Sequence, residues 1–277
     1  GYVEFAPGDG PVGVKVGISY VSQAGAEANL AAENPSYRSF DSVQEAAHRA
    51  WRERLGAVRV GGGTDDERTT FYTALYHALL HPNVISDADR RYRGSDGEVH
   101  RVGGGHRAQY GTFSGWDVYR DQVQLLTLLD PRTGSDIAQS LYELAGQNGG
   151  VWDRWLHGAS GTHVMNGDPS PTTLAGIRAF GGTDFDLRGA LRSLVRAATV
   201  ATIGAHFRPC SARLKNRMLT ATPLPPTTQK RATSSANRPA RRLFGALGVL
   251  WGPMTGGVAM GARLSVRCTA TGPEPPR

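Results

Sequence analysis

Apolar residues recur along this chain at two spacings, and the spacing changes near residue 22. Apolar and polar or glycine positions alternate over residues 12–21, and residues 2–5 alternate in the same way. Alternation with a period of two predicts β-strands, and Pro7-Gly8-Asp9-Gly10 between the two runs predicts a turn. Beyond residue 22 the apolar positions recur every three or four residues, which predicts helices. The chain is therefore expected to begin as strands and to continue as a helical series.

Capping residues and prolines mark where these helices begin and end. Thr64-Asp65-Asp66-Glu67 predicts a capping box with acids in the first turn, and Asp41 with Gln44 predicts another. Proline ends the helix before Pro82 and the helix before Pro131. The predicted helices span residues 23–33, 41–56, 65–81, 118–129, 135 or 136 to 146, about 171–180, and 184 or 186 to 198.

Two short excursions into strand interrupt the helices. Val58-Arg59-Val60 predicts a return strand ahead of three glycines, and Asp96-Gly97 predicts a hairpin turn between residues 91–93 and 99–101. We interpret the second as a loop excursion outside the core. Over residues 65–199, helices joined by long, aromatic-rich loops fit an array of α-hairpins closing into a toroid, with a site built from loops at one end. The periodicity alone equally permits a helical bundle.

The densest chemical signal lies in Thr112–Arg120. Ser114-Gly115 leads into Trp116 and Asp117, which are predicted to lie on the loop that enters a helix. Asp117 can cap that helix, or it can point outward and accept hydrogen bonds from a ligand. An aromatic ring beside a carboxylate suits a sugar, since the ring packs on C–H faces and the carboxylate accepts from hydroxyls. The alternative is an ordinary capped helix with a core tryptophan.

Histidines and glycine runs give weaker signals. His77 and His81 are four residues apart on a predicted helix, but no acid lies between them in the zinc-protease pattern, so core or capping roles are expected. His157 and His163 lie on a loop and could line a sugar pocket. The glycine runs at 61–63 and 103–105 lack the Lys-Ser/Thr of a phosphate loop, so we expect hinges there.

Charge divides the chain near residue 200. Residues 201–277 hold 12 Lys and Arg and one acid, Glu274, which leaves 19 basic and 23 acidic residues in 1–200. The sequence pI of about 9.7 therefore comes from the tail alone. Both cysteines are in the tail, so neither a disulfide framework nor a thiolate metal site is expected before it. The sequence contains no run of eighteen apolar residues, so no membrane-spanning helix is expected. The absence of an initial Met or signal peptide suggests a cut inside a longer protein.

Several unusual blocks in series resemble glycoside hydrolase family 92. The resemblance covers about residues 1–199. It is carried by these blocks: Ile18-Ser19-Tyr20-Val21-Ser22, Ala28-Asn29-Leu30, Phe71-Tyr72-Thr73-Ala74-Leu75-Tyr76-His77, Phe113-Ser114-Gly115-Trp116-Asp117-Val118-Tyr119-Arg120 and Gly167-Asp168-Pro169.

This resemblance implies an exo-acting, calcium-dependent α-mannosidase that inverts anomeric configuration and is secreted, periplasmic or on the cell surface. It implies an α+β fold, with residues 1–22 ending a β-sandwich, 23–63 forming a helical linker with a short return strand, and 64–199 forming the first part of an (α/α)6 barrel. The mannose-binding role of the family's Trp-Asp block falls on Asp117 with Trp116 beside it, and Asp168 is either a pocket residue or a helix cap. The implied partner is a mannose-containing glycan, with no nucleic acid or membrane partner.

The chain departs from the family in its tail. The family's Glu-Gly-Asn, Asn-Asp-Asp and Gly-Asn-Glu-Pro blocks, which carry the acid, the base and calcium ligands, do not occur in this sequence. An inverting glycosidase needs two carboxyl groups roughly 6.5–9.5 Å apart, and after Asp186 the only acid is Glu274. We therefore expect no catalytic residue and no metal ligand in this chain, and a fragment without turnover. Apolar faces such as Leu187/Leu191/Leu194 should lack their neighbours.

Three interpretations of residues 200–277 remain open. The segment is a basic tail that binds nucleic acid, a divergent domain, or the product of out-of-frame translation of a GC-rich gene. We favour the last, which yields a non-homologous, aberrant basic tail. Translation of the underlying DNA in the other two frames should recover the acidic blocks, and their absence from both frames would contradict it.

Overall fold

A computed structural model describes residues 12–200 and 263–270 of the 277-residue chain, the last eight as backbone only. Eight helices lie in these ranges: α1 (Gln23–Glu33), α2 (Phe40–Leu55), α3 (Asp65–Ala78), α4 (Gly115–Val118), α5 (Gln122–Leu129), α6 (Pro131–Gln147), α7 (Ser170–Ala179) and α8 (Leu187–Thr199). The strands there are β1 (Val12–Ser19), β2 (Asn83–Val84), β3 (Arg91–Arg93), β4 (Val99–Arg101), β5 (Tyr110–Gly111), β6 (Leu156–His157), β7 (Ser160–Gly161) and β8 (Arg263–Ala270).

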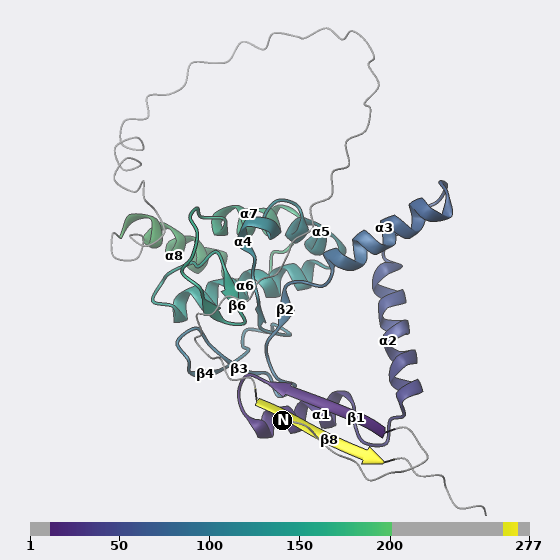
Figure 1. Ribbon diagram of the computed structural model, residues 1–277. Helices are drawn as coiled ribbons and strands as arrows, with labels where there is room; N and C mark the ends of the chain where they lie inside the picture. Colours follow the sequence, from purple (N-terminus) through teal and green to yellow (C-terminus); the bar gives the residue numbers. More distant parts are fainter. Residues whose placement is uncertain (1–11, 201–262, 271–277) are drawn as a thin grey trace, which may run out of the picture. The chain divides into compact units, whose positions relative to one another are not determined.

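The predicted strand near the start of the chain is confirmed as β1. It pairs antiparallel with β8, and α1 packs against it (Figure 1). The close approach requires Gly17, because a Cβ there would lie 2.3 Å from the carbonyl oxygen of Ala26. The sequence did not predict β8. The predicted turn at 7–10 and the strand at 2–5 lie outside the described residues.

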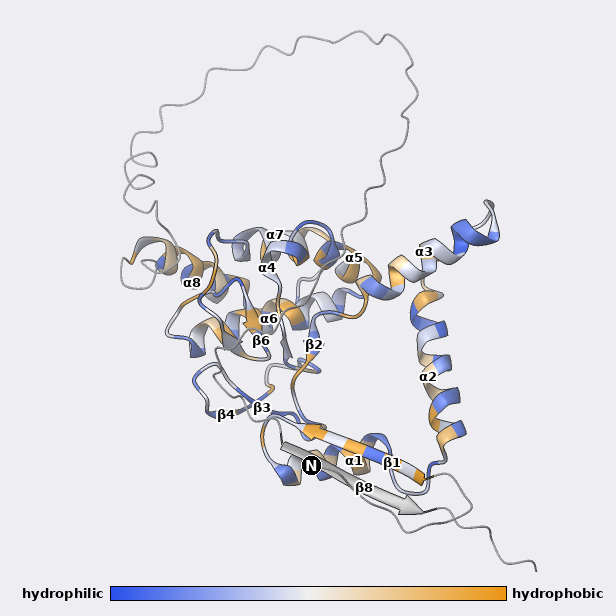
Figure 2. Ribbon diagram, in the orientation of Figure 1, coloured by the Kyte–Doolittle hydropathy of each residue, from blue (hydrophilic) through white to orange (hydrophobic). Residues whose placement is uncertain are grey.

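The apolar side of β1 is exposed. Its small or polar residues face α1, whereas its alternate apolar residues are 43–54% exposed and give the strand its orange bands in Figure 2. These are Val12, Val14, Val16 and Ile18. Alternation therefore located the strand correctly, while the burial it usually signals is absent from the described structure.

A hydrogen-bonded joint connects β1 and α1 to the segment before β3. The carboxylate of Asp87 accepts from the Ser19 hydroxyl at 2.7 Å and from the Asn29 amide at 2.8 Å. The guanidinium of Arg93 donates to the carbonyls of Tyr20 and Val21. Two of the sequence blocks that carried the family resemblance therefore have a structural role here, because they supply the groups of this joint.

Helices α2 and α3 differ from prediction in their ends and their burial. Helix α2 begins at Phe40 because Ser39, and not Asp41, caps it by accepting from the Ser42 N–H. The capping box at Thr64–Glu67 is confirmed. The strand predicted at 58–60 is wrong, since these residues are irregular.

Helix α3 ends at Ala78, three residues before His81, and Leu75 is its one buried residue. Helix α2 has no buried residue at all. Helix α3 therefore does not pack on most sides in the described structure. Tyr76 of α3 contacts Trp51 of α2 instead, with ring centroids 4.6 Å apart.

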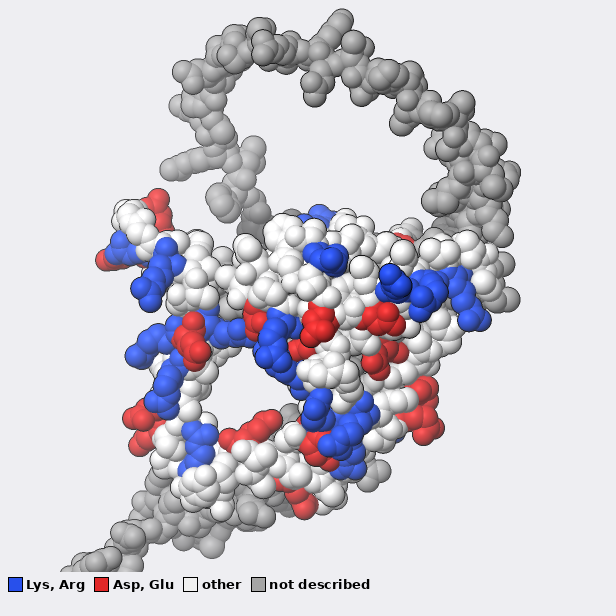
Figure 3. Space-filling view, turned by 180° about the vertical axis from the view of Figure 1, so that it is seen from behind, with Lys and Arg blue, Asp and Glu red and all other residues white. Residues whose placement is uncertain are grey.

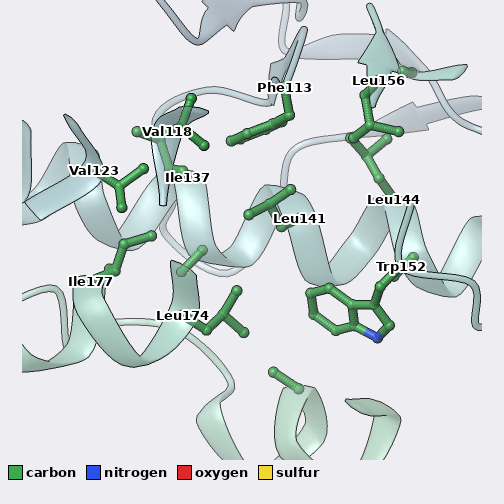
Figure 4. Close-up of a cluster of buried hydrophobic side chains, with 14 of the residues drawn as sticks. Phe113, Val118, Val123, Ile137, Leu141, Leu144, Trp152, Leu156, Leu174 and Ile177 are labelled. Atoms are coloured by element: carbon green, nitrogen blue, oxygen red, sulfur yellow. The ribbon is translucent and has the colours of Figure 1, made fainter. Parts of the chain in front are cut away.

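The hydrophobic core lies where α5, α6 and α7 meet (Figure 4). Ile137 and Leu144 of α6 and Ile177 of α7 are almost completely buried in it. The hairpin predicted around Asp96-Gly97 is confirmed as β3 and β4. Its placement outside the core is wrong, because Tyr92 of β3 has no exposed surface and belongs to this cluster.

Helix α6 begins four or five residues earlier than predicted. Asp130 is its N-cap and accepts from the backbone N–H groups of Arg132 and Thr133, and Pro131 occupies the first turn. Proline is well suited to that position, since it lacks the N–H that would be unsatisfied there. The same Asp-Pro pair that ends α5 therefore also begins α6.

We expect the Asp130 cap to make stability depend on acid pH. Burial favours a raised pKa, but hydrogen bonds from Thr133 and the positive charges of Arg107 and Arg54 hold the pKa of Asp130 at about 2, against 3.8 for an unperturbed group. The stabilisation is present above pH 4 and is lost as the pH falls toward 2, and amounts to on the order of 2 kcal/mol. Urea unfolding between pH 2 and 6 should show this slope, and Asp130→Asn should flatten it. An unchanged slope in Asp130→Asn would contradict the assignment.

Helix α8 begins after Asp186, one of the two predicted starts, and Asp186 caps it by accepting from the Gly189 N–H. Leu187 and Leu191 are 42% and 58% exposed, as expected for an apolar face without neighbours, whereas Leu194 packs partly against the core. No helix in the described part of the chain has the length and apolar content to cross a membrane. Acidic and basic side chains are interspersed on the face shown in Figure 3.

Candidate functional site

Trp116 and Asp117 lie within a helical turn of their own. They belong to α4, which is separated from α5 by Tyr119–Asp121, so the single helix predicted here is two. Asp117 is exposed and accepts a hydrogen bond from the Ser114 hydroxyl. The predicted cap of the longer helix is wrong, because Asp121 occupies the N-cap position of α5. The carboxylate of Asp117 can therefore reach a ligand from outside.

Trp116 is half-buried and contacts the loop before α7. Its indole N–H donates to the carbonyl of Asn166 at 2.8 Å, and its ring centroid lies 6.2 Å from that of Trp155 at an interplanar angle of 59°. A Cβ added at Gly167 would meet Nε1 of Trp116 at 3.7 Å. The Trp-Asp block and the Gly-Asp-Pro block, fifty residues apart in sequence, are therefore neighbours in the structure.

Gly115 allows the Trp-Asp block and the Gly-Asp-Pro block to lie close together. Its backbone N–H donates to the carbonyl of Arg154 at 2.7 Å, and a Cβ at this position would lie 2.5 Å from that oxygen and 2.7 Å from Cγ of Pro169. A larger residue would force the two segments apart. The glycine before Trp116 is thus required by packing between the segments.

Arg154 organises the loop from inside. It is 1% exposed and donates to the carbonyls of Val164, Met165 and Gly167 at 2.6–2.9 Å. Burial lowers the pKa of Arg154, and the neighbouring carboxylate of Asp153 opposes that effect. The sequence analysis missed this residue, because an arginine whose partners are loop carbonyls leaves no spacing pattern.

Asp168 is half-buried at the end of the same loop. The N-cap position of α7 is occupied by Pro169, so Asp168 is not the N-cap residue. The pocket role of Asp168 stays a prediction. Asp117, Trp116 and Asp168 thus come from the two segments that the Trp116–Asn166 hydrogen bond joins.

The remaining candidates are distributed over the surface. His77, His81 and His157 are exposed, so a core role for the first two is wrong. His163 has the partner that the sequence did not reveal, since its Nδ1 lies 3.3 Å from Oδ2 of the buried Asp153. Arg120 donates to the carbonyl of Trp116.

The side chains that could bind a metal ion are not gathered at one place in the described residues. Within residues 12–200, no three His, Cys, Asp or Glu side chains are grouped so that they could hold a metal ion. The described residues therefore do not fit a calcium site, and we derive no chemical step through that metal. The site contains the indole rings of Trp116 and Trp155, an exposed carboxylate and a half-buried carboxylate. Groups of these kinds can bind a sugar.

The match to a family model shows the class of protein to which this chain belongs. Residues 25–236 match the model of the glycosyl hydrolase family 92 catalytic domain, and the chain belongs to that family. The match extends past residue 199, where the resemblance in the sequence was expected to stop.

Solved structures support the same assignment. A family GH92 α-mannosidase from Bacteroides thetaiotaomicron, in complex with mannoimidazole, is 26% identical with a TM-score of 0.60, over 65% of this chain and 23% of that one. A family GH92 inverting mannosidase from Bacteroides thetaiotaomicron VPI-5482 is 26% identical with a TM-score of 0.59, over 65% and 24%.

A curated protein of Arthroderma benhamiae described as an uncharacterized secreted glycosidase is 34% identical over 87 residues, which is 29% of this chain and 11% of that protein. The chain thus spans less than a quarter of the length of these relatives.

Proposed function

We propose that this chain is part of an α-mannosidase and that Trp116, Asp117 and Asp168 hold the terminal mannose of a glycan. The observation that carries the proposal is the hydrogen bond between the Trp116 indole and the carbonyl of Asn166, which brings the two family blocks together. Family membership supports the glycosidase class, and the mannosidase structures with similar folds support mannose as the sugar.

We further propose the finer architecture that the family implies. Helices α3 to α8 would be the first part of an (α/α)6 barrel, α1 and α2 a helical linker, and β1 the end of a β-sandwich. The exposed apolar sides of β1 and α8 support this assignment, because an apolar face is normally buried against a further layer. The whole protein would invert configuration, require calcium and act outside the cell, consistent with the secreted glycosidase it resembles.

In this account the 277-residue chain binds sugar and does not hydrolyse it. The blocks for acid, base and calcium are absent from its sequence. Hydrolysis of terminal α-linked mannose is the function of the family, and the alternative, a non-catalytic carbohydrate-binding remnant, is the one that we expect for this chain. A basic-tailed nucleic-acid-binding protein is a third function, and it predicts salt-sensitive binding that disappears on truncation at residue 200. On the face shown in Figure 3, acidic and basic side chains are interspersed, so this face gives that function no support.

Replacement of Asp117 by asparagine should weaken sugar binding. A carboxylate that accepts from two hydroxyls makes charge-assisted hydrogen bonds, so Asp117→Asn should raise the Kd for methyl α-mannoside roughly tenfold or more. Isothermal titration of the 277-residue chain measures this effect.

Asp121→Asn is the matched control, since Asp121 is also exposed, is four residues away and makes no side-chain cap. The control should bind methyl α-mannoside like the unmodified chain. Equal affinity of the Asp117 and Asp121 variants would contradict the proposed role of Asp117.

A further inference from the structure

The indole N–H of Trp155 lies beside the candidate site without a hydrogen-bond partner. Its Nε1 is buried and has no hydrogen-bond partner in the described structure. Such donors are rare in folded proteins, because an unsatisfied buried group costs roughly 1–3 kcal/mol. The other indoles near it are satisfied, since Trp116 donates to Asn166 and Trp152 donates to the Ser193 hydroxyl at 3.0 Å.

The backbone of Trp155 is held in place by hydrogen bonds on both sides of the residue. Its N–H donates to the Asp153 carboxylate at 3.0 Å, and its carbonyl accepts from both the N–H and the hydroxyl of Thr162 at 3.0 Å. It also forms an isolated antiparallel bridge with Ser114, the residue that holds the carboxylate of Asp117. The backbone therefore fixes Trp155 next to the Trp-Asp block.

The loop that follows Trp155 in the sequence has unusual backbone angles and hydrogen-bonds to the Trp155 backbone. We call residues 162–167 the strap, and most of them are exposed. His163 and Met165 of the strap have φ angles of 53° and 66°, in the left-handed region that non-glycine residues rarely adopt. Side-chain hydrogen bonds from Arg154 and Trp116 to its carbonyls help to hold the strap down. A shift of the strap would relieve this backbone strain, and the hydrogen bonds from Thr162 to the Trp155 carbonyl couple the strap to Trp155.

We propose that the indole N–H of Trp155 donates to a hydroxyl oxygen of the bound α-mannoside when the strap shifts. This inference rests on the proposed function and deepens it, because it adds a second indole to the residues that contact the sugar. The ring of Trp116, 6.2 Å away and tilted by 59°, offers a face to the C–H groups of the same sugar. The ligand oxygen supplies the acceptor that the described protein groups do not.

The test compares two tryptophan-to-phenylalanine variants in the 277-residue chain. Trp155→Phe removes an unpaired donor, whereas Trp152→Phe removes the same atoms and leaves the Ser193 hydroxyl without its partner. Trp155→Phe should raise the Kd for methyl α-mannoside about 2- to 10-fold, and Trp152→Phe should leave it unchanged. Melting temperatures should show the reverse order, with the larger drop in Trp152→Phe.

Nuclear magnetic resonance can follow binding of the mannoside to the unmodified chain. The chain has five tryptophans, and the variants assign the indole N–H signals of two of them. Addition of methyl α-mannoside should shift the Trp155 signal and leave the Trp152 signal in place.

The outcomes separate this inference from the proposed function. Mannoside binding that Asp117→Asn weakens and Trp155→Phe leaves unchanged would overturn the inference and keep the function. An equal drop in melting temperature for the two phenylalanine variants would also overturn it, by showing that a water already pairs with Trp155. Absence of binding by the unmodified chain would overturn both.

Discussion

Ile137→Ala should lower the free energy of unfolding by about 2–5 kcal/mol. Ile137 has no exposed surface and lies at the centre of the cluster formed by α5, α6 and α7 (Figure 4). Truncation removes three buried carbons and leaves a cavity, because the neighbouring helices cannot close it fully. Urea unfolding followed by circular dichroism measures the change in the midpoint.

The matched control for this prediction is Leu128→Ala in α5. Leu128 is 63% exposed, so its truncation should change the free energy of unfolding by less than about 1 kcal/mol. The two variants remove similar volumes of side chain, and only burial differs between them. Similar costs for both variants would contradict the location of the core.

Local signals in the sequence predicted the helices well, because capping is local chemistry. Residues 23–33 are helical as expected, the box at Thr64–Glu67 is where the sequence placed it, and α8 begins after Asp186, one of the two predicted starts. The start of α6 was missed because Asp130-Pro131 was interpreted only as an end, although an aspartate before proline can also open the next helix.

Burial was harder to predict than secondary structure. Alternation in β1 and the stripe on α8 are amphipathic patterns, and both leave apolar side chains exposed in the described structure. Conversely, Tyr92 lies in a short polar hairpin and is fully buried. Periodicity reports which residues share a face, but what covers that face depends on the rest of the fold.

The candidate site was predicted in part. Its short blocks identified Trp116, Asp117 and Asp168, and the structure brings the two segments that carry them together. Arg154 and the unpaired N–H of Trp155 could not be predicted, because both depend on distances between residues of an irregular loop. The tertiary contacts of such a loop leave no periodic trace in the sequence.

Absence of turnover is the second large effect that we expect. Inverting hydrolysis requires a general acid and a general base on opposite sides of the sugar, and each contributes typically 10²–10⁴-fold to the rate. The family blocks that would carry these groups do not occur in the sequence. Trp116 and Asp117 can orient a mannoside, but binding alone does not cleave the glycosidic bond.

Release of the phenol from an aryl α-mannoside, followed with and without added calcium, tests the central claim most directly. An active family GH92 α-mannosidase, run in parallel, is the positive control. Our account predicts that the 277-residue chain releases no product above the buffer rate in either condition. Calcium-dependent turnover by this chain would contradict it.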